Sequence, residues 1–334
     1  MSDITIAIPF VAQTLMGARH SGYDVQRVLK SCGIAPSLLA RPRARVPLDS
    51  FVQLLQTLMR LMDDEALGLL DRPQRLGSFN LIARSTLHET NLGGALQCYV
   101  QSANVFNDGL IYYMTQNGSQ VVFGLRVGQG VHPRSTYILE SAVMTAHRYF
   151  CWLCRARIGV SLVELNYAAP AWEDEYRFLF FGAPVRFNQP EIRVWMDAKV
   201  LNLPVQQDAE TLASYIARAP RDMFTPVRSP QVSQQARRYI LEQIRQQQGV
   251  PRIDATAQAL GLSTQTFWRR LKDERTDYTA VRTQARRDTA IALLADPTHS
   301  VEMIAERLGF SESSAFIRAF RQWTGMTPLA YRKA

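Results

Sequence analysis

The sequence predicts two domains: an α+β amino-terminal domain, with a helical opening and then a mainly antiparallel sheet with a covering helix, and an all-α carboxy-terminal domain. Three observations support this prediction. Apolar residues recur at helical spacing at first, and alternate after Leu110. Three prolines follow Ala219 within eleven residues and mark a linker. Beyond them, a pattern of helix, glycine and second helix occurs twice, which predicts two helix-turn-helix units joined by a linker helix.

The helical opening covers residues 1–108. Apolar residues recur at helical spacing before Leu29, and Pro47 opens an amphipathic helix, because proline is well suited to a first helical turn. Residues 75–108 predict two further helices, with a break near Thr90.

The sheet is expected after this opening. Residues 110–127 predict a β-hairpin, because Asn117-Gly118 is the strongest short turn signal. A long helix is expected over residues 135–158. Short strands follow in LVELNY, PVRF and IRVWM, with a helix near 174–181 between them. Together these elements predict a mainly antiparallel sheet covered by at least one helix.

A domain of this kind can hold a small molecule between its sheet and a helix. Four aromatic side chains are candidates for lining such a pocket: Tyr112, Tyr113, Phe123 and Tyr149. The alternative is a plain core role, which is the more frequent one for aromatic residues at these spacings.

Cys151 and Cys154 form a CxxC motif, and His147 precedes them so that all three can share one helix face. Such a set is a conceivable soft-metal or redox site. However, the sequence indicates no second CxxC and no fourth ligand, and the flanking HRYFCWLCRARI is typical of an apolar core helix. Since free cysteines are usually buried, we expect core residues here and neither a metal nor a cofactor.

The linker divides the chain into residues 1–222, a connection at 223–232 and a second domain at 233–334. The second domain is expected to open with a helix over residues 231–247, followed by a turn.

The two helix-turn-helix units are related by an internal repeat. Residues 257–263 match residues 305–311 at an offset of 48 positions, with the glycines Gly261 and Gly309 at the point where the first helix must end. The offset then becomes 49, since Arg269 corresponds to Arg318. The second unit is therefore expected to carry one extra residue early in its second helix.

The segment between the two units, residues 277–296, contains no glycine and predicts a continuous helix. At about 1.5 Å per residue it would span roughly 28 Å. This length approaches the roughly 34 Å between successive major-groove segments on one side of a duplex. The spacing is compatible with one chain contacting two adjacent grooves.

These residues resemble the signature of the AraC/XylS transcriptional regulators. The matching positions are Gly309, Phe310, Ser314, Phe316, Arg318, Phe320, Gly325, Thr327, Pro328, Tyr331 and Arg332. The upstream unit, residues 260–272 with 285–294, is similar to the first unit of the family. The sequence departs from the family at Arg275, where a glycine is usual, and at Trp268, where a polar residue is more common. Residues 92–96, LGGAL, are similar to a segment in the arabinose-binding-like amino-terminal domains of a subset of the family.

The resemblance implies a sequence-specific DNA-binding transcription regulator, and specifically an effector-responsive activator. By position in the family pattern, the residues expected to contact base edges are Gln265, Trp268, Arg269, Ser313, Ser314, Ile317 and Arg318. Those expected to contact the DNA backbone or to support the recognition helices are Ser263, Thr264, Lys272, Ser311 and Arg321. Ser263 is also a natural N-cap. For Arg269 and Arg318, a phosphate contact or a salt bridge is the alternative to base contact.

The charge distribution agrees with double-stranded DNA as a partner. Residues 228–334 hold 17 Lys+Arg against 10 Asp+Glu, which gives +7 of the net +9. Basic surfaces of this kind neutralise phosphates. A further basic segment, Arg41–Arg45, could contact DNA or an acidic partner, although a solvated loop is expected. RNA polymerase, a small-molecule effector and a second copy of the chain are the other expected partners.

No membrane association is expected, because no apolar run approaches the roughly 18 residues of a membrane span. The start of the chain lacks a basic segment, and Pro9 interrupts its apolar run, so no signal peptide is predicted. Four cysteines in 334 residues do not indicate a disulfide framework. We expect a cytoplasmic protein.

Two other classes of protein are alternatives. One is an enzyme with a borrowed DNA-binding module, as in the adaptive alkyl-transfer proteins, which carry a Pro-Cys-His-Arg nucleophile. The four cysteines here lie in SCGI, QCYV, FCWL and LCRA, and no P-loop, GxGxxG, GxSxG or HExxH motif occurs. We therefore expect no enzymatic activity. The other is a regulator whose first domain only dimerises and binds no ligand; this alternative stays open.

Overall fold

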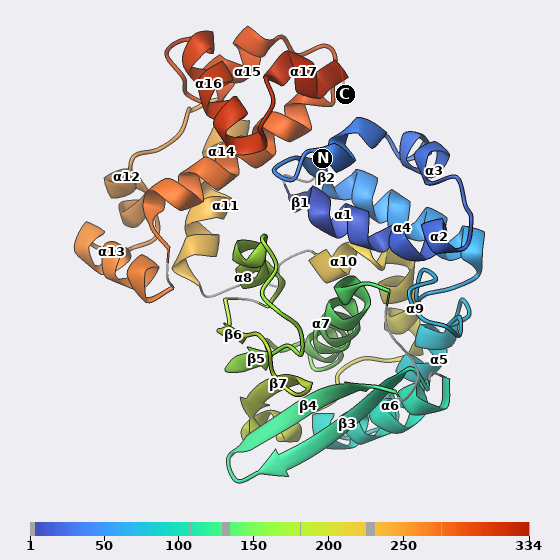
Figure 1. Cartoon of the computed structure of the whole chain (residues 1–334). Coiled ribbons are helices and arrows are strands. Elements are labelled where there is room, and N and C mark those ends of the chain that lie inside the picture. The colour runs from blue at the N-terminus through green and yellow to red at the C-terminus, as the bar shows by residue number, and fades with distance from the viewer. Residues whose placement is uncertain are drawn as a thin grey trace. The chain divides into compact units, whose positions relative to one another are not determined.

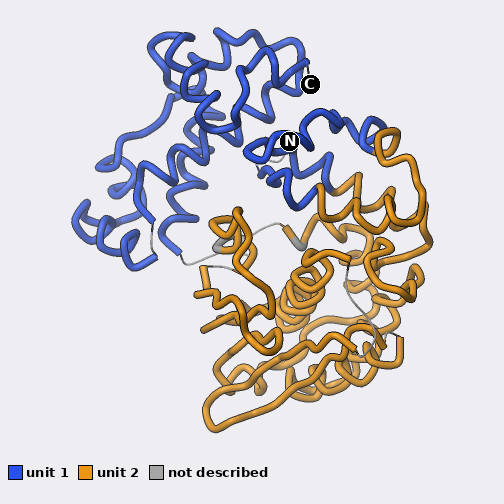
Figure 2. Tube along the Cα trace, in the orientation of Figure 1, with its two compact units in different colours: residues 1–11, 29–51, 226–334 blue, residues 12–28, 52–225 orange. Residues whose placement is uncertain are grey.

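The computed structural model describes residues 4–106, 108–128, 134–180, 182–224, 231–274 and 276–333. The chain separates into two compact units (Figure 2): unit 1 contains residues 1–11, 29–51 and 226–334, and unit 2 contains residues 12–28 and 52–225. The boundaries predicted at 222 and 233 stay a prediction, since the units also place two amino-terminal segments with the carboxy-terminal region. Residues 225–230, most of the predicted linker, and Arg275 lie outside the described residues.

Unit 2 contains the predicted mainly antiparallel sheet (Figure 1). Its five strands are β3 (Leu110–Asn117), β4 (Gln120–Val127), β5 (Leu162–Glu164), β6 (Val185–Arg186) and β7 (Ile192–Asp197). Their order is β3-β4-β7-β5-β6, and every pairing is antiparallel except β5 with β6. The hairpin loop consists of Gly118 and Ser119, because Asn117 pairs with Gln120. Gly118 has φ of 57°, a left-handed conformation that this two-residue turn requires.

The helices of unit 2 include the predicted long helix, α7 (Thr136–Leu153), which Ser135 caps by accepting a hydrogen bond from the amide of Tyr137. The other helices are α2 (Met16–His20), α5 (Ser78–Ser85), α6 (Leu92–Phe106), α8 (Tyr176–Leu179), α9 (Ala209–Arg218) and α10 (Arg221–Phe224). Short 3₁₀ helices lie at Glu173–Glu175 and Ala198–Asn202. The expected break between α5 and α6 is confirmed. Helix α6 packs on β3, and α7 packs on β4.

Aromatic rings fill the core between the sheet and these helices. The ring of Tyr99 on α6 lies 5.1 Å from that of Phe150 on α7, and Phe123 on β4 lies 5.6 Å from Phe150, both edge to face. Phe123, Tyr149 and Phe150 are at most 1% exposed. Strand β4 is buried over five consecutive residues, Val121 to Leu125, and its aromatic residue Phe123 lies in this core.

Unit 1 contains the predicted all-α region. Its helices are α11 (Val232–Arg245), α12 (Ile253–Ala259), α13 (Thr264–Asp273), α14 (Tyr278–Leu294), α15 (Val301–Arg307), α16 (Ser313–Thr324) and α17 (Pro328–Lys333). Their shared core includes Phe267, Phe316 and Phe320, which are fully buried. The helix expected at 231–247 and the linker helix expected at 277–296 are both confirmed to within a few residues.

Two amino-terminal strands, β1 (Thr5–Ala7) and β2 (Arg45–Pro47), pair antiparallel within unit 1. The sequence pattern predicts only helices here, because strands of three residues are too short to show alternation. The basic segment Arg41–Arg45 is not a fully solvated loop, since Arg45 lies in β2 and is 5% exposed. A 3₁₀ helix at Pro36–Ala40 precedes it. The boundaries between the units fall within α1 (Ile8–Thr14), α3 (Val25–Ser31) and α4 (Leu48–Met62).

Candidate DNA-binding surface

The first helix-turn-helix consists of α12 and α13. Gly261, with φ of 68°, ends α12 in the left-handed conformation, which glycine adopts without strain. The hydroxyl of Ser263 accepts a 3.2 Å hydrogen bond from the amide of Thr266, which confirms Ser263 as the N-cap of α13. Phe267 and Leu271 are buried. These contacts fix which face of α13 turns away from the core.

The outer face of α13 presents the predicted contact residues together. Thr264, Gln265, Trp268, Arg269 and Lys272 are all exposed, and together they border one hollow of the surface. Trp268 is 56% exposed, which is unusual for so large an apolar side chain. This face offers a tryptophan ring, an amide and two positive charges on successive helical turns.

The second helix-turn-helix, which consists of α15 and α16, differs from the first at its turn. Gly309 again adopts a left-handed conformation, with φ of 71°. The N-cap of α16 is Glu312, whose side chain makes no capping hydrogen bond, and not Ser311. The extra residue expected early in the second helix therefore lies in the turn, because the two N-caps, Ser263 and Glu312, are already 49 positions apart.

The predicted residues of α16 are exposed to different degrees. Ser314, Arg318 and Arg321 are exposed, as is Ser311 before the helix. Ser313 is half-buried, and Ile317 packs partly against the core of unit 1. The exposed surface that Ile317 offers to DNA is therefore smaller than that of Trp268 in the first helix-turn-helix.

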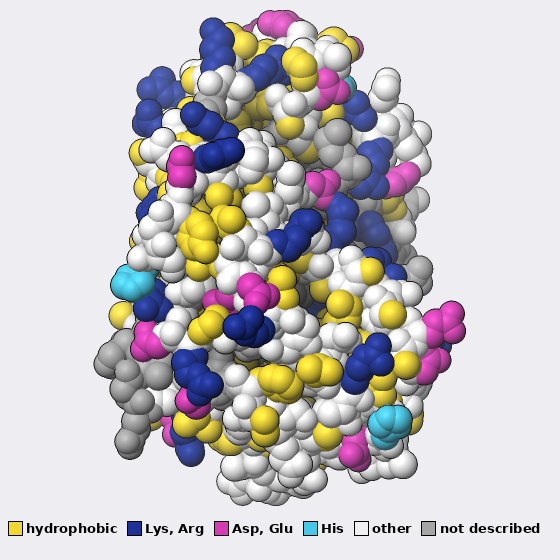
Figure 3. Space-filling model, turned by 90° about the vertical axis from the view of Figure 1, so that its right-hand side faces the viewer, with side chains coloured by type: hydrophobic (Ala, Val, Ile, Leu, Met, Phe, Trp, Pro, Cys, Tyr) yellow, Lys and Arg dark blue, Asp and Glu magenta, His cyan; other side chains and the backbone are white. Residues whose placement is uncertain are grey.

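The basic residues of these two faces are not engaged in ion pairs. Within the part of the chain that the structure describes, Arg269, Lys272, Arg318 and Arg321 form no salt bridge. Among the described residues, Arg269 and Arg318 thus do not form the salt bridge that was one alternative, and their contacts with bases or phosphates stay a prediction. On the face shown in Figure 3, by contrast, basic and acidic side chains are interspersed.

Helix α14 connects the two helix-turn-helix motifs, and α13 and α16 lie near its opposite ends (Figure 1). Arg286 of α14 supports the second turn: its Nη2 donates a 3.2 Å hydrogen bond to the carbonyl of Gly309, and its guanidinium lies 4.6 Å from the ring centroid of Phe310. No motif of the sequence predicts this role of Arg286. Gly309 lies 23 residues further along the chain, so no short sequence pattern predicts its contact with Arg286.

Unit 2 contains a cavity of about 380 Å³. It is lined by α4, α5, α6, β3, α7 and α9, together with residues 65–67, 74, 76–77 and 219–220. Of the four aromatic residues expected to line a pocket, Tyr112 lies in the wall and Tyr113, Phe123 and Tyr149 do not. The neighbouring Tyr113 points to the other face of β3, where its hydroxyl donates to Glu191.

The other two expected pocket residues belong to the core. Phe123 is 1% exposed, and the hydroxyl of Tyr149 lies 2.6 Å from that of Thr86 and donates to the carbonyl of Ala83 at 2.9 Å. These bonds hold Tyr149 on the core side of α7. The tyrosines that line the cavity are instead Tyr99, Tyr112, Tyr137 and Tyr215.

His147, Cys151 and Cys154 are buried on α7. The Nε2 atom of His147 lies 2.9 Å from the carbonyl of Ile158, and burial lowers the pKa of His147 to about 4. Burial also raises the pKa of Cys154 to about 11. Among the described residues, no group of three His, Cys, Asp or Glu side chains could hold a metal ion.

No described helix is long and apolar enough to cross a membrane.

The chain is similar to known transcription regulators over most of its length. The family described as "Arabinose-binding domain of AraC transcription regulator, N-term" matches residues 22–205, more than half of the chain, and a helix-turn-helix family matches residues 256–334. The Ornithine utilization regulator of Pseudomonas aeruginosa is 26% identical over 327 residues, which cover 94% of this chain and 92% of that protein.

The HTH-type transcriptional regulator VirS of Mycobacterium tuberculosis is 26% identical over 320 residues, with the same coverage of both chains. The crystal structure of the transcriptional regulator CdpR from Pseudomonas aeruginosa is 22% identical, with a TM-score of 0.34, and the match covers 84% of this chain and 96% of that chain. Because the arabinose-binding-domain family of AraC regulators matches more than half of the chain and a helix-turn-helix family matches residues 256–334, the chain belongs to the AraC/XylS family and is a DNA-binding transcription regulator.

Proposed function

We propose that the protein is an effector-responsive transcription activator that contacts two adjacent major-groove segments with α13 and α16. The observation that carries this proposal is the pair of exposed polar and basic helix faces near opposite ends of α14. At about 1.5 Å per residue, the 17 residues of α14 extend roughly 25 Å. This length is shorter than, but comparable to, the roughly 34 Å between successive major-groove segments on one side of a duplex.

The side chains on the two faces favour different contacts. The guanidinium groups of Arg269 and Arg318 can each bond to O6 and N7 of one guanine, and Gln265 can bond to N6 and N7 of an adenine. Trp268 offers an apolar surface for a thymine methyl group. Ser263, Thr264, Lys272, Ser311 and Arg321 border these positions and suit phosphate contacts. Ser313, Ser314 and Ile317 complete the second recognition face.

The cavity of unit 2 supports an effector, and it favours ligand sensing over an amino-terminal domain that only dimerises. An effector changes activity only if it binds one conformation of the regulator more tightly than another. The Pseudomonas aeruginosa relative is named for ornithine utilization, which is compatible with control by a small metabolite. A relative named "HTH-type transcriptional activator CfaD" from Escherichia coli is 33% identical over 72 residues and supports activation. The proposal includes RNA polymerase and a second copy of the chain as partners, location in the cytoplasm and no enzymatic activity.

The test is selection of genomic fragments by the full-length protein at about 0.15 M salt, followed by footprinting. Two short motifs about one helical turn apart are expected in the bound sites. Arg269→Ala and Arg318→Ala should each cost about 1–3 kcal/mol on a preferred site and relax specificity at one position, each in a different motif. Arg245→Ala is the control, since Arg245 is an exposed arginine of α11 that pairs with Glu242. Binding without sequence preference, abolished by modest salt, would contradict the proposal.

A further inference from the structure

The cavity of unit 2 has an uneven distribution of charge. Among its described lining residues, Glu65 is the one acidic side chain, and neither lysine, arginine nor histidine is present. The rest of the wall is apolar, hydroxyl or amide in character. A ligand that brings a negative charge into this space would therefore find no cation to pair with.

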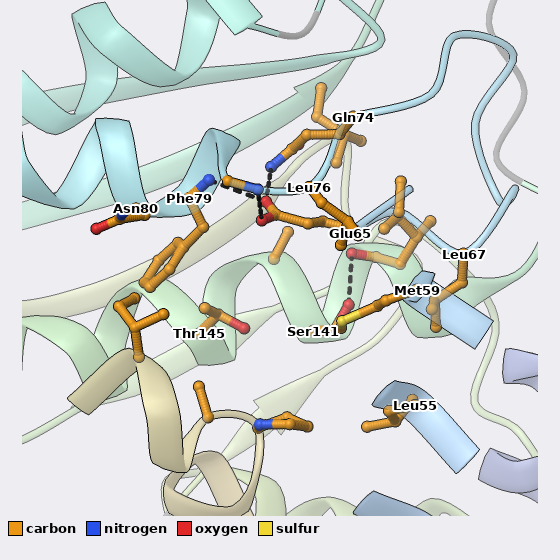
Figure 4. A pocket seen from close by; sticks show the side chains of 18 of the residues that line it. Leu55, Met59, Glu65, Leu67, Gln74, Leu76, Phe79, Asn80, Ser141 and Thr145 are labelled. Atoms are coloured by element: carbon orange, nitrogen blue, oxygen red, sulfur yellow. Dashed lines mark hydrogen bonds between the residues drawn. The ribbon is translucent and has the colours of Figure 1, made fainter. Parts of the chain in front are cut away.

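The carboxylate of Glu65 is held in place by the backbone that follows it. Its Oε1 accepts a 2.8 Å hydrogen bond from the amide of Gly77, and its Oε2 accepts from the amide of Phe79 at 2.9 Å and from the side chain of Gln74 at 3.2 Å. Figure 4 shows this carboxylate in the cavity wall beside Phe79 and Gln74. Since a carboxylate offers about four acceptor positions, one on Oε1 remains for a ligand donor.

Two opposing effects act on the ionisation of Glu65. Burial raises the pKa of the Glu65 carboxyl above 4.5, and the hydrogen bonds from Phe79, Gly77 and Gln74 partly offset this rise. The neighbouring carboxylate of Asp64 also raises it. An unpaired negative charge in this wall is thus costly, and a bound cation would relieve that cost.

The rest of the cavity wall complements a cation with an apolar body. The rings of Tyr99, Tyr112, Tyr137 and Tyr215 line the wall, and each of these residues is at most 9% exposed. The negative face of an aromatic ring attracts cations, and buried rings also pack well against apolar groups. The volume lies at the lower end of the range for small-molecule pockets.

We infer that this cavity binds a small organic cation, a protonated amine on an apolar chain or ring, with its ammonium group at Glu65 and its apolar body among the four tyrosines. The inference rests on the proposed effector-sensing function and names the chemical class of the ligand. The ammonium group donates to Oε1 of Glu65 in a charge-assisted hydrogen bond.

The test uses two series of probes that are matched in shape and differ in charge. One series is 2-phenylethylammonium, 2-phenylethanol and 3-phenylpropanoate; the other is hexylammonium, hexanol and hexanoate. Binding to the full-length protein is measured by calorimetry and by the rise in melting temperature. The ammonium compounds are expected to bind about tenfold more tightly than the alcohols, and the carboxylates more weakly than either.

Variants then locate the binding. Glu65→Gln should remove the preference for the ammonium compounds, whereas Glu210→Gln, an exposed glutamate of α9, should leave it unchanged. If Glu65→Gln does not fold, Ala142→Leu is the second variant, because Ala142 lines the cavity and a larger side chain there would exclude every probe.

The outcomes separate this inference from the proposed function. Equal or tighter binding of the carboxylates or alcohols, abolished by Ala142→Leu, would overturn the inference and keep the effector site. Failure of all six probes would overturn the inference as well as the ligand-binding part of the proposed function. If the ammonium compounds bind at Glu65 but change neither DNA binding nor transcription in vitro, the inference stands and effector control fails.

Discussion

The hydroxyl of Thr5 donates a 2.6 Å hydrogen bond to Oδ1 of Asp288, a residue 283 positions further along the chain. Arg237 and Arg287 bond to the same carboxylate at 3.0 and 3.2 Å, and Arg45 Nε lies 3.9 Å from it. Asp288 is 2% exposed. Burial raises the pKa of Asp288, but the charges of Arg287, Arg237 and Arg45 outweigh burial and hold this pKa below its ordinary value.

Asp288→Ala is expected to destabilise unit 1 by about 3–5 kcal/mol at pH 7, because it removes the carboxylate that the buried Arg45 and the half-buried Arg237 and Arg287 share. Chemical denaturation of the full-length protein, followed by helical circular dichroism, would measure the loss. The matched control is Asp254→Ala, since Asp254 is an exposed aspartate of α12. A loss below about 1 kcal/mol, similar to that of the control, would show that the arginines do not depend on Asp288.

Arg286→Ala is expected to weaken DNA binding mainly through the second helix-turn-helix. Its guanidinium bonds to the carbonyl of Gly309 and lies over Phe310, so its removal loosens the turn before α16. A footprint should lose protection over the α16 half-site more than over the α13 half-site. Arg282→Ala, an arginine one helical turn earlier on α14, serves as the comparison. Equal loss at both half-sites would mean that Arg286 acts on α14 as a whole or on a phosphate.

Ser263→Ala should cost about 1 kcal/mol of stability, because it removes the side-chain cap from α13. Ser263→Thr keeps a hydroxyl at the same position and should cost less. The two variants are compared by their denaturant midpoints at constant slope. If they lose the same stability, the capping hydrogen bond to Thr266 contributes little.

The stability of unit 2 is expected to depend on pH through Glu140. This carboxyl accepts hydrogen bonds from the hydroxyls of Tyr167 and Tyr176, and burial raises its pKa from 4.5 to about 7. The folded protein therefore holds the proton more tightly than the unfolded chain, so stability falls as the pH rises from about 4.5 to about 7. The full effect is at most roughly 3 kcal/mol.

Glu140→Gln tests this dependence, because glutamine keeps an acceptor for the tyrosines and removes the titration. His147 acts in the opposite direction: its lowered pKa makes stability rise with pH between about 4 and 6.5. The difference in melting temperature between the wild type and Glu140→Gln cancels this term. The variant should gain stability relative to the wild type between pH 5 and pH 8, and a constant difference would contradict the assignment.

Local patterns predicted most of the secondary structure. The Asn117-Gly118 turn signal predicted the hairpin, although its loop is Gly118 and Ser119. Glycine at positions 261 and 309 marked both helix-turn-helix turns, because few other residues adopt positive φ without strain. The strands β1 and β2 were missed because three residues are too few to show a period.

Asp288 could have been noticed in the sequence. It lies on α14 within the run ARRDTAIALL, where the apolar neighbours Ala285 and Ile291 share its side of the helix. A carboxylate on such a face requires partners, which a helical projection suggests but does not identify.

The lining of the cavity is the feature that the sequence predicted least well. The sequence singled out Tyr112 and Tyr113 together, but adjacent residues of a strand face opposite sides, and only the packing of α6 and α7 on the sheet decided which of them lines the cavity. Glu65 gave no signal, because its role depends on the amides of Gly77 and Phe79 and on rings from four separate elements.

The sequence by itself determined most of the helices of this protein, the β-hairpin and the exposed residues of α13. These depend on interactions within about four residues, namely helical spacing, capping and glycine turns. Only the tertiary structure decided that Thr5 and Arg45 belong with Asp288, and that Glu65 lies in a tyrosine-lined cavity. Contacts between residues far apart in the chain depend on how whole elements pack, and no local period in the sequence encodes that packing.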